Sequence, residues 1–352
     1  MPPILQTITD AIINSTPDKK DISLATGNSG RILFLATSYL KTGDESCHEK
    51  INELLDQNFM ILEKEPLSTS FRNGLVGFGW LLQHLGEHRL LDQEELTDIL
   101  RQFDRIITSD IHQKTGTLQD LAGFNTRIFQ TSHYLFPRLK KSGDIKPVLE
   151  AVVNHLNHII PDFMNAGNTP FQSPETAPAI LFLCTCVRLG IQEQKSKALI
   201  TFILANIVIS LSLFTDKNTF FPLRDSSDGR TVSLDLNMAH ALWEAAKICK
   251  NTYWRRLACI ILKYNTYNKD KNHDFFYQSG IARDHWGIAY RYRYFYQETA
   301  FRLLEKNSNF WCDTKLLPSL NSKYGVPGLE NGISGIGLAL IPPMDQSLIG
   351  II

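Results

Sequence analysis

Hydrophobic residues recur along this chain at the three- and four-residue spacings of amphipathic helices. The clearest case is residues 46–63, with apolar side chains at Ile51, Leu54, Leu55, Phe59, Ile61 and Leu62. No alternating run of apolar and polar residues is long enough to predict a strand that competes with these helices. The pattern therefore predicts an all-α protein.

The predicted helices come in pairs joined by short breaks. The first pair comprises a turn-plus-helix unit at residues 23–40 and a second helix at residues 46–63, with Thr42-Gly43-Asp44-Glu45 as the break between them. The second pair covers residues 70–85 and 96–107. Each pair is predicted to be an α-helical hairpin, which is the unit of many helical repeat proteins.

Glycine-rich turns mark the start of three hairpins. They lie at residues 27–35, 74–82 and 328–341, and in each the glycines lead directly into an apolar segment. Gly30 and Gly77 are 47 residues apart, which is at the upper end of the periods of helical repeats. These turns therefore indicate an internal repeat.

Four further helix starts are predicted between these turns. They lie at residues 121–134, where most of the glycines are missing, and at 174–183, 234–243 and 287–296. The seven hairpins predict a closed ring, because each unit must bury its apolar face on its neighbours and a ring needs no capping repeat. The glycine turns should then meet at one end, where we expect a pocket.

Composition and charge narrow the function classes. Lys and Arg number 36, as do Asp and Glu, so no broad electrostatic field predicts binding to nucleic acid or an anionic membrane. Residues 1–7 lack the basic region and apolar core of a secretory signal, which predicts a cytoplasmic protein. The longest apolar run, residues 198–214, contains polar residues and is shorter than the ~20 residues of a membrane span. It predicts a buried helix and no integral membrane segment.

The cysteines favour structural thiols. They are Cys47, Cys184, Cys186, Cys249, Cys259 and Cys312. None of them forms a C-x-x-C motif, and only Cys47 has a neighbouring histidine. Reduced thiols inside the protein are therefore predicted in preference to a metal framework.

The glycine repeats and the tail match a known pattern. Residues 328–341, the ending 344–348 (with methionine in place of a tryptophan), and residues 23–44 and 70–85 resemble the last repeat, the tail and the first two repeats of one family. That family is the lanthionine synthetase C-like proteins, the cyclases of lanthipeptide biosynthesis. The resemblance implies an α/α toroid of seven inner and seven outer helices, which forms a single domain over residues 1–352.

The resemblance also implies a zinc site of two cysteines and a histidine, which activates a peptide cysteine thiol for addition to a dehydrated serine or threonine. Val232 takes the place of one cysteine in the fifth repeat, and Ala282, Arg283 and Asp284 take the Cys-His-Gly positions of the sixth. All three ligands are therefore predicted to be missing, because valine and alanine offer no lone pair and Arg283 is a fixed cation. We expect no zinc or other cofactor.

A shifted alignment leaves a second possibility open at this site. It would bring together Asp235, Asp284 and His285, a set of ligands able to hold a harder divalent ion. The shift requires gaps inside a helical repeat where the ungapped match is good. The metal-free prediction is therefore preferred.

Three residues are catalytic candidates. Where the family carries an Ala-His-Gly-x-Pro motif with an acid/base histidine, this chain has Pro174-Glu175-Thr176-Ala177-Pro178. Glu175 could act as a base if burial raised its pKa, although an acid at a helix start is also typical of a favourable interaction with the helix dipole. The catalytic aspartate of the third repeat falls on Asp120 or, one place earlier, on Gln119. His285 is the third candidate.

Other side chains near the predicted pocket are candidates for binding substrate: Asp235, His240, Arg283, Asp284 and Trp286. A histidine in such a place is equally typical of a structural hydrogen-bond donor. Residues Tyr290, Arg291, Tyr292, Arg293, Tyr294 and Tyr296 could, with Arg283, hold an acidic or aromatic peptide segment. The alternative is a helix that buries its tyrosine rings and leaves its arginines in solvent.

These residues support a ranked set of functions. The first hypothesis is a degenerate family member that has kept the toroid and lost zinc, and binds a precursor peptide or a dehydratase-type biosynthetic enzyme. The alternative is an active cyclase that forms thioethers at a non-standard or metal-free site. A two-carboxylate glycosidase using Glu175, Asp235 or Asp284 ranks third, because no sugar-stacking aromatic residues are predicted around them.

Overall fold

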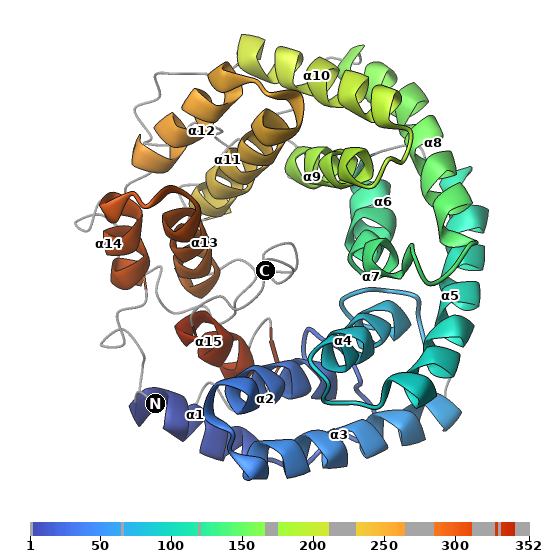
Figure 1. Cartoon of the computed structure of the whole chain (residues 1–352), viewed down its shortest axis with the longest axis vertical. Helices are drawn as coiled ribbons and strands as arrows, with labels where there is room; N and C mark the ends of the chain where they lie inside the picture. The colour runs from blue at the N-terminus through green and yellow to red at the C-terminus, as the bar shows by residue number, and fades with distance from the viewer. Residues whose placement is uncertain are drawn as a thin grey trace. The chain divides into compact units, whose positions relative to one another are not determined.

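The structure is a computed structural model, and it describes residues 3–64, 67–118, 121–165, 175–210, 230–264, 285–311, 328–329 and 332–341. Within these ranges every regular element is a helix and no strand occurs, which confirms the predicted all-α class. The chain divides into two compact units. Figure 1 labels the helices of both units. The first unit comprises residues 1–103 and 273–352, and the second comprises residues 104–272.

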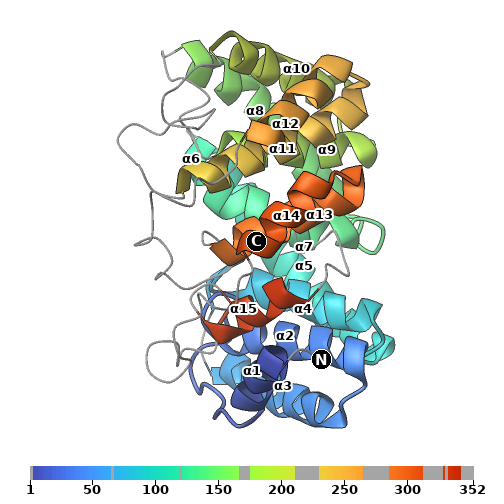
Figure 2. The ribbon, with the colours of Figure 1, turned by 90° about the vertical axis from the view of Figure 1, so that its left-hand side faces the viewer.

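The first unit is built around helix α2. Its helices are α1 (Pro3–Ile13), α2 (Asn28–Thr42), α3 (Glu45–Lys64), α4 (Leu75–Glu87), the start of α5 (Gln93–Thr115), α13 (His285–Thr299), α14 (Arg302–Trp311) and α15 (Ile333–Leu340). Helix α2 packs against α3, α4 and α15, and α13 packs against α14 and α15. Figure 2 shows α15 beside α2 from a second direction, so the first and last glycine repeats are neighbours.

The second unit is built around helix α9. Its helices are the rest of α5, α6 (Leu121–Phe124), the π-helix η1 (Asn125–Phe129), α7 (Gln130–Arg138), α8 (Ile145–Asn165), α9 (Thr176–Arg188), α10 (Glu193–Ser210), α11 (Arg230–Cys249) and α12 (Thr252–Tyr264). Helix α9 packs against α10, α11 and η1, while α11 packs against α12 and α10 against α8. The predicted pairs of helices are therefore present in this unit as α9–α10 and α11–α12.

Within the predicted units at residues 23–40 and 70–85, helix α2 begins at Asn28 and α4 at Leu75, after Ser- and Thr-containing stretches that fold as turns. Helix α10 was predicted to be buried, but Phe202 on its outer face is 38% exposed. Helix α1 was not predicted, although its buried residues follow the helical spacing.

The cysteines within the described ranges are free thiols, as predicted. Cys184 and Cys186 have no exposed surface, and burial raises the pKa of Cys184 to about 12. Burial likewise raises the pKa of Cys47 to about 11. These side chains therefore remain protonated packing groups, and as thiols they are poor metal ligands.

None of the helices in the described ranges has the length and apolar character needed to cross a lipid bilayer.

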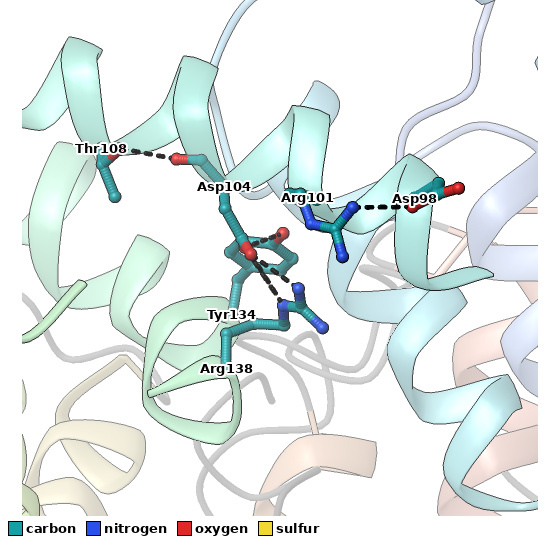
Figure 3. A network of polar contacts seen from close by, with 6 residues as sticks. All are labelled: Asp98, Arg101, Asp104, Thr108, Tyr134 and Arg138. Atoms are coloured by element: carbon teal, nitrogen blue, oxygen red, sulfur yellow. Dashed lines mark hydrogen bonds and ion pairs between the residues drawn. The ribbon is translucent and has the colours of Figure 1, made fainter. Parts of the chain in front are cut away.

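A buried ionic network fixes the third repeat in the second unit (Figure 3). Arg138 on α7 donates to both carboxylate oxygens of Asp104 on α5, with the shortest contact from Nη2 to Oδ2 at 2.6 Å. The hydroxyl of Tyr134 donates to Oδ1 of Asp104 at 2.6 Å. All three side chains are buried, and burial together with the carboxylate raises the pKa of Tyr134 above its ordinary value. The network therefore ties α5 to α7 through satisfied polar groups.

Asp104→Ala should lower the free energy of unfolding by about 3–5 kcal/mol, because it leaves the Arg138 guanidinium buried without its counter-charge. Urea denaturation followed by circular dichroism measures the change. Asp98→Ala on the same helix is the matched control, since the Asp98–Arg101 pair is exposed and should contribute less than about 1 kcal/mol. Equal losses for the two variants would contradict the assignment.

Candidate functional site

The starts of α2 and α4 lie at the end of the helices where the glycine turns were predicted to meet and to form a pocket. Gly27 and Gly74 precede the two helices in extended conformations and offer no side chain for capping. The next residue in each repeat donates its amide to a carbonyl seven residues earlier. Asn28 donates to Asp21 at 3.0 Å and Leu75 donates to Ser68 at 2.9 Å. In both repeats the preceding loop therefore caps the helix with its own backbone.

The two loops share further hydrogen bonds. In each loop a polar side chain accepts a hydrogen bond from the amide two residues later. The amide of Ser23 donates to Oδ1 of Asp21 at 2.8 Å, and the amide of Ser70 donates to Oγ of Ser68 at 3.4 Å. The hydroxyls of Ser23 and Ser70 in turn accept from the amides three residues further on, at 3.2 and 3.3 Å. The repeat seen in the sequence is thus a repeat of hydrogen bonds.

Glycine is required at both ends of this motif because the loop lies directly on the helix. A Cβ atom on Gly74 would come within 2.0 Å of the Ser68 carbonyl oxygen, and one on Gly77 within 1.9 Å of the Phe71 carbonyl oxygen. Gly30 is equally close to Leu24, where a Cβ atom would come within 2.4 Å of the carbonyl oxygen. No side chain can occupy these places without moving the loop.

Three glycine turns meet at this end of the first unit, as the ring prediction required. The amide of Ala25 donates to the carbonyl of Arg72 at 3.1 Å, which joins the loops of the first two repeats. A Cβ atom on Gly328 would come within 2.5 Å of the Cα atom of Thr26, so the last repeat touches the same loop. The loop before α2 is therefore shared by three repeats.

Glu175 lies at the start of α9 in the second unit. It occupies the N-cap position with helical backbone angles, is half-buried, and makes no side-chain capping hydrogen bond. A carboxylate here interacts favourably with the positive end of the helix dipole. Its place at a helix start matches the prediction, while its catalytic role stays a prediction.

Asp235 and His240 lie on α11, also in the second unit. Asp235 has no exposed surface, and His240 is half-buried. Five residues separate them, so they point to different faces of the helix. The buried carboxylate lies one turn from Val232, which is the third residue of the same helix. Their roles in binding substrate stay predictions.

The other candidate residues are described in part or not at all. His285 and Trp286 are the first two residues of α13, and the structure describes their backbone but not their side chains. Asp120, Ala282, Arg283 and Asp284 lie outside the described residues. Within the described ranges, no group of three His, Cys, Asp or Glu side chains is arranged to hold a metal ion.

The tyrosine and arginine run on α13 serves the protein interior. Tyr290, Tyr292 and Tyr294 are buried, as the alternative prediction expected. The expectation that the arginines stay in solvent was wrong. Arg291 is buried, and burial lowers the pKa of its guanidinium to about 10. Arg293 donates to the carbonyl oxygens of residues 339 and 341, at 3.0 and 3.3 Å, and so caps the end of α15.

Comparison with known proteins places these repeats in a family. Residues 18–168 match the family model described as lanthionine synthetase C-like protein. This stretch belongs to the lanthionine synthetase C-like family. The chain is also similar in structure to nisin cyclase, with a TM-score of 0.73 and 17% sequence identity, over 99% of this chain and 96% of that chain. No curated protein sequence matches the chain.

The similarity to nisin cyclase shows the fold of the chain. It confirms the predicted fold class, an all-α α/α toroid. The resemblance stated from the glycine motifs is confirmed for residues 18–168 by the family match. The assignment of residues 1–352 to a single domain stays a prediction.

Sequence reasoning missed the residues that hold the glycine turns. Asp21 and Ser68 precede the first glycine of their repeats by the same six residues, and Ser23 and Ser70 precede it by four. This spacing of polar residues was the available signal. The prediction relied on the glycines alone to mark the turns.

Gly77→Ala should lower the free energy of unfolding by about 3 kcal/mol, because the new methyl group would displace the Phe71 carbonyl. Thermal or urea denaturation measures the loss. Gly143→Ala is the control, since a Cβ atom there meets nothing within 4 Å and should change stability by less than about 0.5 kcal/mol. A Gly77→Ala variant as stable as the control would show that the loop yields easily.

Proposed function

We propose that this lanthionine synthetase C-like chain has lost zinc and acts in the cytoplasm by binding a precursor peptide or a dehydratase-type biosynthetic enzyme. The family match and the fold of nisin cyclase support a role in modified-peptide biosynthesis. A fold does not by itself supply an activity, because activity resides in the site. The residues at the positions that match the family's zinc ligands therefore decide between binding and catalysis.

Val232 carries the proposal. Helix α11 is continuous from Arg230 to Cys249, so Val232 and the motif residues Asp235 and Leu236 share one helical register. An alignment gap that would bring another residue to the zinc-ligand position has to fall inside this helix. Such a shifted alignment is therefore unfavourable. Valine has no lone pair, so this position does not fit zinc.

The sixth repeat supports the same alignment. Helix α13 is continuous from His285 to Thr299, so the two matching motifs at residues 287–289 and 297–299 also share one helix. The ungapped match then assigns Ala282 and Arg283 to the remaining two ligand positions, which lie outside the described residues. Neither side chain is a zinc ligand.

An active cyclase with a non-standard site is the second candidate. Asp235 favours it, because a carboxylate without exposed surface is unusual for a purely structural residue and lies one turn from the ligand position. With Asp284 and His285 it would supply oxygen and nitrogen ligands for a divalent ion other than zinc. Glu175 would be its candidate base.

Metal analysis tests the loss of zinc. We expect the protein purified from zinc-supplemented cells to hold less than about 0.1 zinc ions per chain by elemental mass spectrometry, because the ligands that make binding favourable are replaced. The triple variant Val232→Cys, Ala282→Cys, Arg283→His is the positive control and should gain zinc. One tightly held zinc ion per wild-type chain would overturn the proposal.

A peptide assay separates binding from catalysis. The chain is incubated with a dehydrated, cysteine-containing precursor peptide, and free thiols are then alkylated and counted by mass spectrometry. We expect the peptide to bind and to keep its alkylatable thiol, because no ligand is left to activate that thiol. Loss of the thiol with the wild type but not with Glu175→Gln would instead establish the active cyclase.

A further inference from the structure

Helix α12 carries a basic stripe on its exposed face. Its thirteen residues include no acidic residue, and the stripe consists of Tyr253, Arg256, Ile260 and Lys263. These positions are three, four and three residues apart, which places them along one side of a helix. Tyr253 is 54% and Ile260 39% exposed, so apolar surface lies between the charges. We call this face the α12 stripe.

Helix α3 carries a stripe of the opposite charge. Its exposed residues include Glu45, Glu49, Glu53, Asp56, Met60 and Glu63, which lie along one side of the helix. Met60 is 44% exposed and interrupts the row of acids with apolar surface. The side chain of Lys50, which is itself buried, pairs with Glu53 at 2.8 Å, so most of the acidic charge is not neutralised by the helix's own lysines. We call this face the α3 stripe.

The two stripes are complementary in charge, in polarity and in length. Each stripe repels a second copy of itself and attracts the other, so like-with-like pairing is disfavoured. The α3 stripe extends over about 30 Å and α12 over about 20 Å, so the basic stripe fits within the acidic one. The chain as a whole has no net charge, so repulsion between whole molecules does not oppose such pairing.

We propose that the α12 stripe of one molecule docks on the α3 stripe of a second copy of this chain. Tyr253 and Ile260 would then bury apolar surface against Met60, while Arg256 and Lys263 face the row of carboxylates. One such contact is smaller than a standard stable interface, so the association is weak and salt-dependent.

Sedimentation velocity over a range of protein concentrations tests the association. At about 50 mM salt we expect a concentration-dependent rise in the sedimentation coefficient, and at about 500 mM salt a dissociation constant at least about tenfold higher. A chain that sediments as a monomer at all concentrations in low salt overturns the proposal. Association that is unchanged by salt also overturns it.

Charge reversal identifies the surfaces. Arg256→Glu with Lys263→Glu, and separately Glu49→Lys with Asp56→Lys, should each raise the dissociation constant at least about tenfold. Mixing these two double variants should restore association, because the reversed stripes are again complementary. Lys140→Glu with Lys141→Glu reverses two charges on a turn and should change nothing.

The outcomes are distinguishable from those of the proposed function. Circular dichroism checks that each variant is folded, and neither zinc nor peptide enters the measurement. Failure of the mixed variants to associate overturns the pairing of α12 with α3, even if the wild type self-associates. Binding of the wild type to a different acidic protein, without self-association, would likewise overturn it.

Discussion

The structure depends on the close approach of a loop backbone to the first turn of a helix. In the first two repeats, the carbonyl oxygens of Asp21, Leu24, Ser68 and Phe71 occupy the places where a Cβ atom would otherwise project. Those loops also supply the acceptors that cap the helix starts. Glycine therefore contributes in two ways, since it admits the loop and lets the loop replace a side-chain cap. The helix orientation follows from this contact.

The third repeat shows how the chain manages without these glycines. Here His155 on α8 lies 2.9 Å from the carbonyl oxygen of Leu118 and stacks on the ring of Phe124. The Asp104 and Arg138 pair fixes the following helix from the other side. Side chains thus hold a segment that backbone contacts hold elsewhere, and a π-helix follows directly at residues 125–129. A π-helix is tolerated where surrounding packing over-determines the backbone.

The sequence predicted most of the fold because helical spacing and glycine turns are local signals. It did not predict the hydrogen bonds that hold the turn residues 23–27 and 70–74, since polar turn residues carry no apolar pattern. The interior role of Arg293 could not be predicted, because it depends on α15, which is distant in sequence. For the candidate site, position was predictable at Glu175, whereas protonation and metal binding depend on neighbours brought together by folding.

The contact between Gly328 and Thr26 joins residues about 300 positions apart. During synthesis one of the surfaces that packs on the loop before α2 therefore emerges from the ribosome about 300 residues after that loop. Until then the ring of Phe34, which packs against Gly337, lacks its final partner, and such long-range contacts form slowly. Burial of the apolar face of α2 therefore has to wait for this contact between distant repeats.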